Sequence, residues 1–503
     1  MLSDMKRFLI AILVSIFACI FIPSSVNADD GLIWNYKNDD FLDYLKNNDE
    51  KKFIERQKKL DEEIKRSLDV NLLPVNLEDC ITIMLKNSST LQIAKANKDA
   101  AKWTFANSMT FLLPDFYYRY QIQDVRGEIL VGSVLPVKLH VNPVYSGFSA
   151  TYPIFADWSQ FFLAASSRSL YKAAEHNLNR TREELLKNVA TSYYDLLQSK
   201  LNIEVLIVNM RDRNEQLRLM QARHQIGVGT KYDVLRAQAE YAKSKMELIN
   251  ALNTLRLRQA ALADTMGLDV MIAVYPIESN VDTIELVEKK YDIENLYKVA
   301  LSLRQDVKAK EREVMSLNYI KKSNYTDFAP KIELTYDYAR QGTLQMGNLR
   351  PSTTWGLAAV WPLGQKLGVA TMTKEKADAA KLRAAQYELR RLKGDVKQYI
   401  LTAYYDSSSA LERITANKKE VEAADEGVRF AIVGFEVGNN DFLDVLDSQT
   451  TKTQARVQLI NSMIDYNKAQ VNLLYETGII SPKTLLRCYK TPSVLNQKYR
   501  FEE

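Results

Sequence analysis

Apolar residues recur every three to four positions over most of the chain, which is the spacing of an amphipathic helix. Helices are predicted over residues 77–111, 158–224, 232–266, 293–326, 365–435 and 441–476. The two longest runs contain no proline, and at a rise of 1.5 Å per residue each would be about 100 Å long. A helix of that length must lie against other helices, because an isolated helix is only marginally stable in water.

A second pattern, alternation with a period of two, predicts four strands. They cover about residues 115–126, 144–155, 331–339 and 353–362. In the third strand, Tyr336 shares a face with apolar neighbours, whereas Glu333 and Asp337 share the opposite face with Thr335. Such alternation with large aromatic residues is typical of strands that span an outer membrane, although one strand alone would also suit a soluble sheet. The side chains expected to face lipid are Tyr336, Leu357 and Trp361.

The chain carries an internal duplication. Residues 77–85 read LEDCITIML, and residues 293–301 read IENLYKVAL, at an offset of 216. Gly227 precedes Asp-Val-Leu by six residues, and Gly438 does the same at an offset of 211. Because a period near 210 is too long for a solenoid, we expect two structural halves. Their predicted bounds are 76–290 and 291–480, and residues 481–503 form a C-terminal tail.

The N-terminus reads as an export signal. A basic pair at residues 6–7 precedes an apolar run of about 15 residues, and Val-Asn-Ala ends at Ala28. We therefore expect a signal peptide over residues 1–28, with an uncleaved anchor as the alternative. Cys19 faintly resembles a lipidation site. Residues 29–75 are expected to form a charged helical extension. Whether Cys80 and Cys488 pair after export stays open.

Composition narrows the function classes. The 503 residues carry a formal net charge of +5 with no basic patch, so nucleic acid is not an expected partner. Three histidines and three cysteines favour neither a metal site nor a disulfide scaffold. No nucleotide-binding or nucleophile motif is present, so we expect no cofactor, no metal and no catalytic residue. The residual enzyme hypothesis places a metal on Asp441, Asp444 and Asp447.

Four strands per chain constrain the assembly. The smallest closed membrane barrels have about eight strands, and an open sheet edge is not tolerated in lipid. If the four strands span a membrane, several copies must therefore share one barrel.

Taken together, these features resemble the TolC-type outer-membrane efflux proteins. The resemblance covers about residues 76–480 and rests on the duplicated helix–strand–strand–helix halves, the motif from Leu77 to Asn97, and Gly-x5-Asp-Val-Leu at each helical break. It implies a mixed, mainly α fold: a homotrimer with a shared 12-strand β-barrel in the outer membrane and a periplasmic tunnel of long antiparallel helices. The implied partners are outer-membrane lipid, a periplasmic adaptor (membrane fusion protein), and an inner-membrane pump or ABC exporter. The rival interpretation is a periplasmic adaptor or a structural coiled-coil protein.

The resemblance also suggests site residues. Asp444 and Asp447 share one helix face and would line the periplasmic aperture, with Asp233 at the matching place in the first half. A merely solvated acidic face is the alternative interpretation. Phe435 and Asn440 stand where the best-known family member ties neighbouring helices with a tyrosine and an arginine. The expected adaptor-docking tips, with glycines suited to positive φ, are Gly227, Gly229, Gly438, Asn439 and Asn440. The sequence leaves the exported cargo open.

Overall fold

A computed structural model describes residues 72–131, 135–155, 158–278, 281, 283–287, 292–326, 329–344, 349–360 and 368–486. The chain divides into two compact units, Met1–Ile64 and Lys65–Glu503, and all described residues belong to the second. The expected signal peptide, most of the expected helical extension, Cys19, Trp361 and Cys488 lie outside the described residues. Cys80 is buried and makes no disulfide bond within the described part of the chain, and burial raises the pKa of its thiol.

Helices account for most of the described chain, and their lengths repeat. The helices are α4 (Leu77–Asn87), α5 (Ser89–Ser108), α6 (Trp158–Gln225), α7 (Lys231–Met266), α8 (Ile293–Leu303), α9 (Gln305–Tyr325), α10 (Val369–Glu436), α11 (Phe442–Thr477) and α12 (Pro482–Leu486), with a 3-10 turn at Thr110–Leu112. The predicted long helices are confirmed: α6 and α10 have 68 residues each, and α7 and α11 have 36 each. The predictions over 77–111 and 293–326 were wrong in one respect, because each run is broken in two, at Ser88 and at Arg304.

The helix ends follow from local chemistry. At the start of α7, the Thr230 hydroxyl accepts a hydrogen bond from the Asp233 N–H over 3.1 Å, and the Asp233 carboxylate accepts from the Thr230 N–H over 3.2 Å. This reciprocal capping box satisfies two N–H groups that a helix start leaves unpaired. Gly267 and Gly478 end α7 and α11 in the left-handed conformation, with φ of 73° and 72°. A side chain with a Cβ would be strained there.

Four antiparallel strands form the main sheet, in the order β2-β5-β7-β8. They are β2 (Asp115–Ile122), β5 (Pro143–Phe155), β7 (Lys331–Thr343) and β8 (Arg350–Val360). The four predicted strands are confirmed, but the first ends earlier than expected. After Ile122 the chain enters a separate hairpin of β3 (Val125–Val131) and β4 (Leu135–Val141), which the sequence analysis did not predict.

A small parallel pair joins β1 (Leu72–Val75) to β6 (Ala273–Pro276). It corrects the expected helical extension, because the last four residues of the range 29–75 are a strand. Leu73 and Val75 are buried in this strand. The physical reason is a long-range pairing, with a partner about 200 residues away, that no local periodicity reveals.

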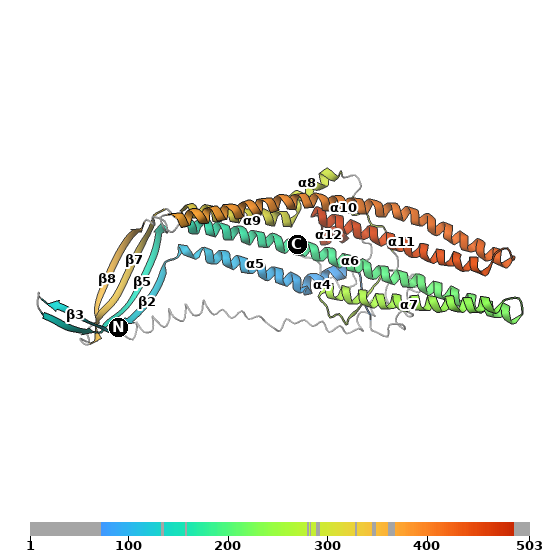
Figure 1. Ribbon diagram of the computed structural model, residues 1–503, viewed down its shortest axis with the longest axis horizontal. Coiled ribbons are helices and arrows are strands. Elements are labelled where there is room, and N and C mark those ends of the chain that lie inside the picture. The colour runs from blue at the N-terminus through green and yellow to red at the C-terminus, as the bar shows by residue number, and fades with distance from the viewer. Residues whose placement is uncertain are drawn as a thin grey trace, which may run out of the picture. The chain divides into compact units, whose positions relative to one another are not determined.

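Long helices run side by side within this unit (Figure 1). The helix α6 packs against α5, α7, α9 and α11, and α10 packs against α8, α9 and α11. The main sheet lies at one end of these helices, and the α6–α7 and α10–α11 turns lie at the other (Figure 1). In the part of the chain that the structure describes, no helix is both long enough and apolar enough to cross a membrane.

Candidate functional site

The two helix turns, residues 226–230 and 437–441, have the same backbone shape. Gly227 and Gly438 adopt φ of 82° and 81°, so the expected positive φ is confirmed at both. It is wrong for Gly229, which is not among the glycines with positive φ. Gly229 is needed for a close approach instead, since a Cβ placed on it would lie 3.1 Å from the Cβ of Arg223.

In the second turn the same close contact is made possible by a glycine at the other of the two contacting positions. At the offset of 211, Gly434 replaces Arg223 and Asn440 replaces Gly229. A Cβ placed on Gly434 would lie 2.6 Å from the Asn440 side chain. In each turn, therefore, one of the two contacting positions is a glycine: the second position in the first turn (Gly229) and the first position in the second turn (Gly434). Asn439 is exposed beside Gly438, whereas Asn440 is half-buried against Gly434.

Both turns expose apolar side chains. Ile226 and Val228 are 74% and 67% exposed in the first turn, and Val437 is 66% exposed in the second. Exposed apolar groups concentrated at a chain tip are typical of an interaction surface. The structure thus presents apolar tips, but the described residues supply no partner for them.

The aspartates expected at the aperture lie near the starts of α7 and α11, Asp233 and Asp444 in the first turns and Asp447 one turn further along α11. Asp444 and Asp447 are both exposed, on the face of α11 opposite the buried Val445 and Leu446. The Asp444 carboxylate also accepts a hydrogen bond from the Asp441 N–H over 3.1 Å. Asp233 is half-buried and engaged with Thr230. Asp233 and Asp444 are therefore helix-capping residues whatever else they do. The spacings Thr-x-x-Asp at residues 230–233 and Asp-x-x-Asp at residues 441–444 could have indicated this role from the sequence.

An apolar cluster lies behind these aspartates. Met220, Ala237, Phe442 and Leu446 are buried together, and Leu217, Val234 and Phe435 pack against them. The Phe435 ring lies 5.9 Å from the Phe442 ring and 4.5 Å below the Arg223 guanidinium. Phe435 therefore stabilises its turn by packing, at the position where the sequence analysis noted a phenylalanine in place of the family's helix-tying tyrosine.

Polar contacts connect α6 to α11 along their length. The buried Arg213 donates from Nη2 to the Thr450 hydroxyl over 2.8 Å and to the Leu446 carbonyl over 3.2 Å. Nearer the sheet, Gln198 donates to Asn461 over 2.7 Å, and Lys468 pairs with Asp195. These side chains hold the hairpin of the first half against the hairpin of the second.

The main sheet has one apolar face and one polar face. Paired residues of antiparallel strands point to the same side. Ala150, Tyr336 and Trp355 lie in register on one side, and the Tyr336 and Trp355 rings are 4.6 Å apart. Ser149, Asp337 and Thr354 lie in register on the other, where Ser149 donates to Asp337. Leu357 is 70% exposed on the apolar side, so no described part of the chain covers it.

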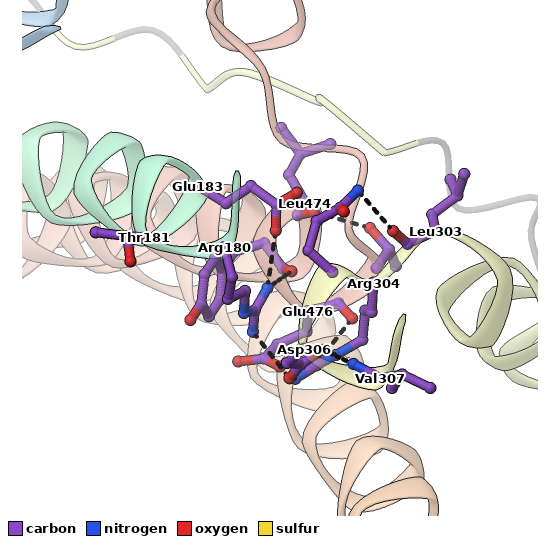
Figure 2. Close-up of polar contacts among 12 residues, drawn as sticks. Arg180, Thr181, Glu183, Leu303, Arg304, Asp306, Val307, Leu474 and Glu476 are labelled. Carbon is purple, nitrogen blue, oxygen red and sulfur yellow. Dashed lines mark hydrogen bonds and ion pairs between the residues drawn. The ribbon is translucent and has the colours of Figure 1, made fainter. Parts of the chain in front are cut away.

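At the break between α8 and α9, a buried charge network joins three helices (Figure 2). Arg304, which is 2% exposed, donates to the Asp306 carboxylate from Nε over 3.1 Å and from Nη2 over 2.6 Å. It also donates from Nη1 to the Glu476 carbonyl over 3.0 Å. Arg180 of α6 joins by donating to Glu183 over 3.1 Å and to the Tyr475 carbonyl over 3.3 Å. The network links α6, the α8–α9 break and the end of α11.

Burial and pairing shift the pKa values here in opposite directions. Burial raises the pKa of Glu183, and the bond from Arg180 only partly offsets it. Burial opposes ionisation of Asp306 too, but the hydrogen bonds from Arg304 and the charges of Arg180 and Arg304 outweigh burial and lower the pKa of Asp306. Burial raises the pKa of Tyr475 to about 12. None of these residues was predicted from the sequence, because α6, α9 and α11 bring them together from distant positions.

Comparison with known proteins agrees with this architecture. A family model described as outer membrane efflux protein matches residues 80–268 and 296–478, one segment in each half. The chain belongs to the outer membrane efflux protein family. This confirms the resemblance stated from the sequence and disfavours the rival interpretation as an adaptor or a structural rod.

Relatives of this efflux protein are distant in sequence. The outer membrane efflux protein BepC of Brucella suis biovar 1 (strain 1330) is 24% identical over 317 residues, 63% of this chain and 68% of BepC. The outer membrane protein TolC of Escherichia coli (strain K12) is 21% identical over 416 residues, 79% of this chain and 80% of TolC. The solved structure of the outer membrane protein VceC of Vibrio cholerae has a TM-score of 0.68 at 18% identity, covering 80% of this chain and 96% of that chain. Family membership places the efflux protein in the outer membrane, with its helices in the periplasm.

Proposed function

We propose that three copies of this efflux protein form one channel-tunnel, the exit duct of a tripartite efflux or type I secretion system. The observation that carries the trimer is the four-stranded sheet. No described residue covers its apolar face, and among the described residues its edge strands, β2 and β8, each pair on one side only. Unpaired backbone groups are too costly in lipid for such an edge to persist. Pairing β8 of one copy with β2 of the next satisfies both edges, and three copies give a closed 12-strand barrel.

The helices serve as the tunnel in this proposal. The helices α6 and α10 are each about 100 Å long at 1.5 Å per residue, so the α6–α7 and α10–α11 turns would lie far from the membrane. The exposed apolar residues at the turns suit contacts with a periplasmic adaptor, which would connect the duct to an inner-membrane pump or ABC exporter. Asp444 and Asp447 would line the aperture at that end. No step requires catalysis, because the pump supplies the energy.

Separation of membranes followed by mild detergent extraction tests the assembly. We expect outer-membrane fractions to contain a species of three chains by native mass spectrometry. A gene deletion should abolish export of the system's cargo, and the parent chain should restore it. A monomer in the soluble periplasmic fraction would contradict the proposal.

A further inference from the structure

The two halves each contain a junction where two short helices meet the end of a returning helix. In the second-half junction the break is Arg304 and the helix end is Gly478. In the first-half junction the break is Ser88 and the helix end is Gly267. A Cβ placed on Gly267 would lie 2.8 Å from the Asn87 carbonyl oxygen, and one placed on Gly478 would lie 3.0 Å from the Arg304 nitrogen. The two junctions therefore have the same backbone arrangement.

An arginine side chain fills the second-half junction. The Arg304 guanidinium contacts the Asp306 carboxylate over 2.6 Å and the Glu476 carboxylate over 2.5 Å, and it lies 6.0 Å from the Tyr399 ring. Its charge also suits the place, because the guanidinium donates to the Glu476 carbonyl, one of the carbonyl groups that the C-terminal end of α11 leaves without a partner inside the helix.

The first-half junction lacks every one of these groups. The first-half residues that correspond to Arg304, Asp306, Glu476 and Tyr399 are Ser88, Thr90, Thr265 and Asn188, in that order. Each replacement is shorter, and a hollow of about 690 Å³ remains in the place that Arg304 occupies in the other half. Its lining is Ser88, Ser89, Thr90, Leu185, Lys187, Asn188, Thr191, Ser192, Asp264, Thr265, Gly267 and Leu268.

The hollow offers hydrogen-bond acceptors. The Thr191 hydroxyl donates its proton to the Lys187 carbonyl over 2.9 Å, and the Thr265 hydroxyl donates to the Ala261 carbonyl over 2.7 Å. A hydroxyl that has donated its proton presents lone pairs only. Asp264 adds the single carboxylate of the lining. The C-terminal ends of α4 and α7 bring the negative ends of two helix dipoles, which the positive end of α5, beginning at Ser89, partly offsets.

The one basic side chain of the lining has another partner. The Lys187 ammonium lies 4.4 Å from the ring centre of Tyr475, in the second-half junction. A cation so placed is attracted by the aromatic face. Lys187 therefore directs its charge toward α11 rather than filling the hollow as Arg304 fills its own junction.

We propose that the first-half hollow binds a guanidinium or ammonium group supplied from outside the protomer. The bound group takes the place that the Arg304 guanidinium takes in the second half. It donates to the Thr191 and Thr265 oxygens and pairs with Asp264. Two sources share this chemistry: a free organic cation, and a basic side chain of a second copy of the chain.

Calorimetry with agmatine, which carries both a guanidinium and an ammonium group, tests the site on the purified full chain. We expect one agmatine per chain, about ten-fold weaker binding in Asp264→Asn, and no binding in Ser88→Arg, whose new side chain fills the hollow. Ser302→Arg controls for the added charge, because Ser302 is exposed at the end of α8 and outside the hollow. Ser88→Ala controls for loss of the Ser88 hydroxyl, which accepts from the Leu91 N–H at the start of α5. Both should bind agmatine and assemble like the parent.

The oligomeric state separates the two sources. If a side chain of a second copy occupies the hollow, agmatine will not bind to the assembled protein, and Ser88→Arg will dissociate the assembly whereas Ser302→Arg will not. Binding of agmatine to the parent with the assembly of Ser88→Arg intact identifies a free cation. Agmatine binding that Ser88→Arg and Asp264→Asn leave unchanged overturns the proposal. So does the absence of both agmatine binding and any effect of Ser88→Arg on assembly.

Discussion

Arg304 forms the break between α8 and α9, and its side chain makes a two-point ion pair with Asp306 in the first turn of α9, with contacts of 3.1 and 2.6 Å. Arg304 is almost fully buried, so its charge depends on its carboxylate partners. Asp306→Asn removes one of the two carboxylates that pair with Arg304 and leaves only Glu476 to balance its charge. We expect the free energy of unfolding to fall by roughly 3 kcal/mol, because breaking a buried pair leaves a poorly compensated charge. Thermal unfolding followed by circular dichroism measures the change.

The matched control for this prediction is Asp395→Asn. Asp395 pairs with Arg391 at 4.0 Å, and the Arg391 side chain is 80% exposed. A surface pair of this kind contributes little, so the change should stay within about 0.5 kcal/mol. Equal effects of the two substitutions would show that the buried pair contributes no more to the free energy of unfolding than the surface pair.

The junction should also make stability depend on pH in two windows. The pKa of Glu183 is raised by burial, so the folded state binds a proton there more readily than the unfolded chain, whose value is about 4.3. Stability contributed by this group therefore grows as pH falls from neutral toward that value. The pKa of Asp306 is lowered, so its contribution is present above about 3.9 and is lost as pH falls further. The charged groups facing Glu183 are Arg180, Arg304 and Asp306.

Glu183→Gln separates the two windows. Glutamine keeps an acceptor for Arg180 but does not titrate. Midpoints of thermal unfolding between pH 7 and pH 3 should show a smaller rise on mild acidification in the variant than in the parent, with the same loss at the acid end. An unchanged rise in the variant would assign that window to another group.

The long helices could be predicted from the sequence, whereas the breaks in the shorter helices could not, and each outcome has a physical reason. Long runs without proline located α6 and α10 to within a few residues, because nothing local interrupts them. The breaks at Ser88 and Arg304 have no glycine or proline to mark them. They are tertiary features, set by the close approach of Gly267 and Gly478. The acidic face of α11 followed from spacing alone. The Arg304 network, in contrast, joins residues up to 295 positions apart and leaves no local signal in the sequence.

The main sheet offers a test of which face meets lipid. Leu357→Arg places a charge on the exposed apolar side, at a cost of roughly 2–4 kcal/mol per chain if that side lies in the membrane. Ala358→Arg, one residue on, points to the other side and lies opposite Glu333 in register, which can pair with it. We expect the first variant to lose assembled protein in the outer membrane and the second to retain it. Equal amounts of both in membrane fractions would refute the assignment of faces.

Substitution of glycine by alanine should have opposite effects on stability at two positions, one in a helix turn and one inside a helix. Gly438→Ala forces a Cβ into the left-handed conformation, with φ of 81°, and should cost about 1–2 kcal/mol. Gly427→Ala lies inside α10 with open space around its Cβ, and should stabilise the protein by about 0.5–1 kcal/mol. Thermal midpoints compare the two. If the turn docks an adaptor, export assays should also show a loss in Gly438→Ala at full expression, and none in Gly427→Ala.

The proposed aperture can be tested without disturbing the helix start. Because the Asp444 carboxylate caps α11 through the Asp441 N–H, alanine there would confound loss of charge with loss of the cap. Asp444→Asn combined with Asp447→Asn removes both charges and keeps an acceptor at each position. If three copies place these side chains around one axis, the parent forms two rings of carboxylates, which should favour cations and bind divalent ions. In planar bilayers the double variant should conduct with weaker cation selectivity and weaker block by divalent ions. Asp269→Asn, on an exposed residue after α7, should behave like the parent. Unaltered block in the double variant would mean that Asp444 caps its helix and Asp447 meets solvent, and that the constriction is built from other residues.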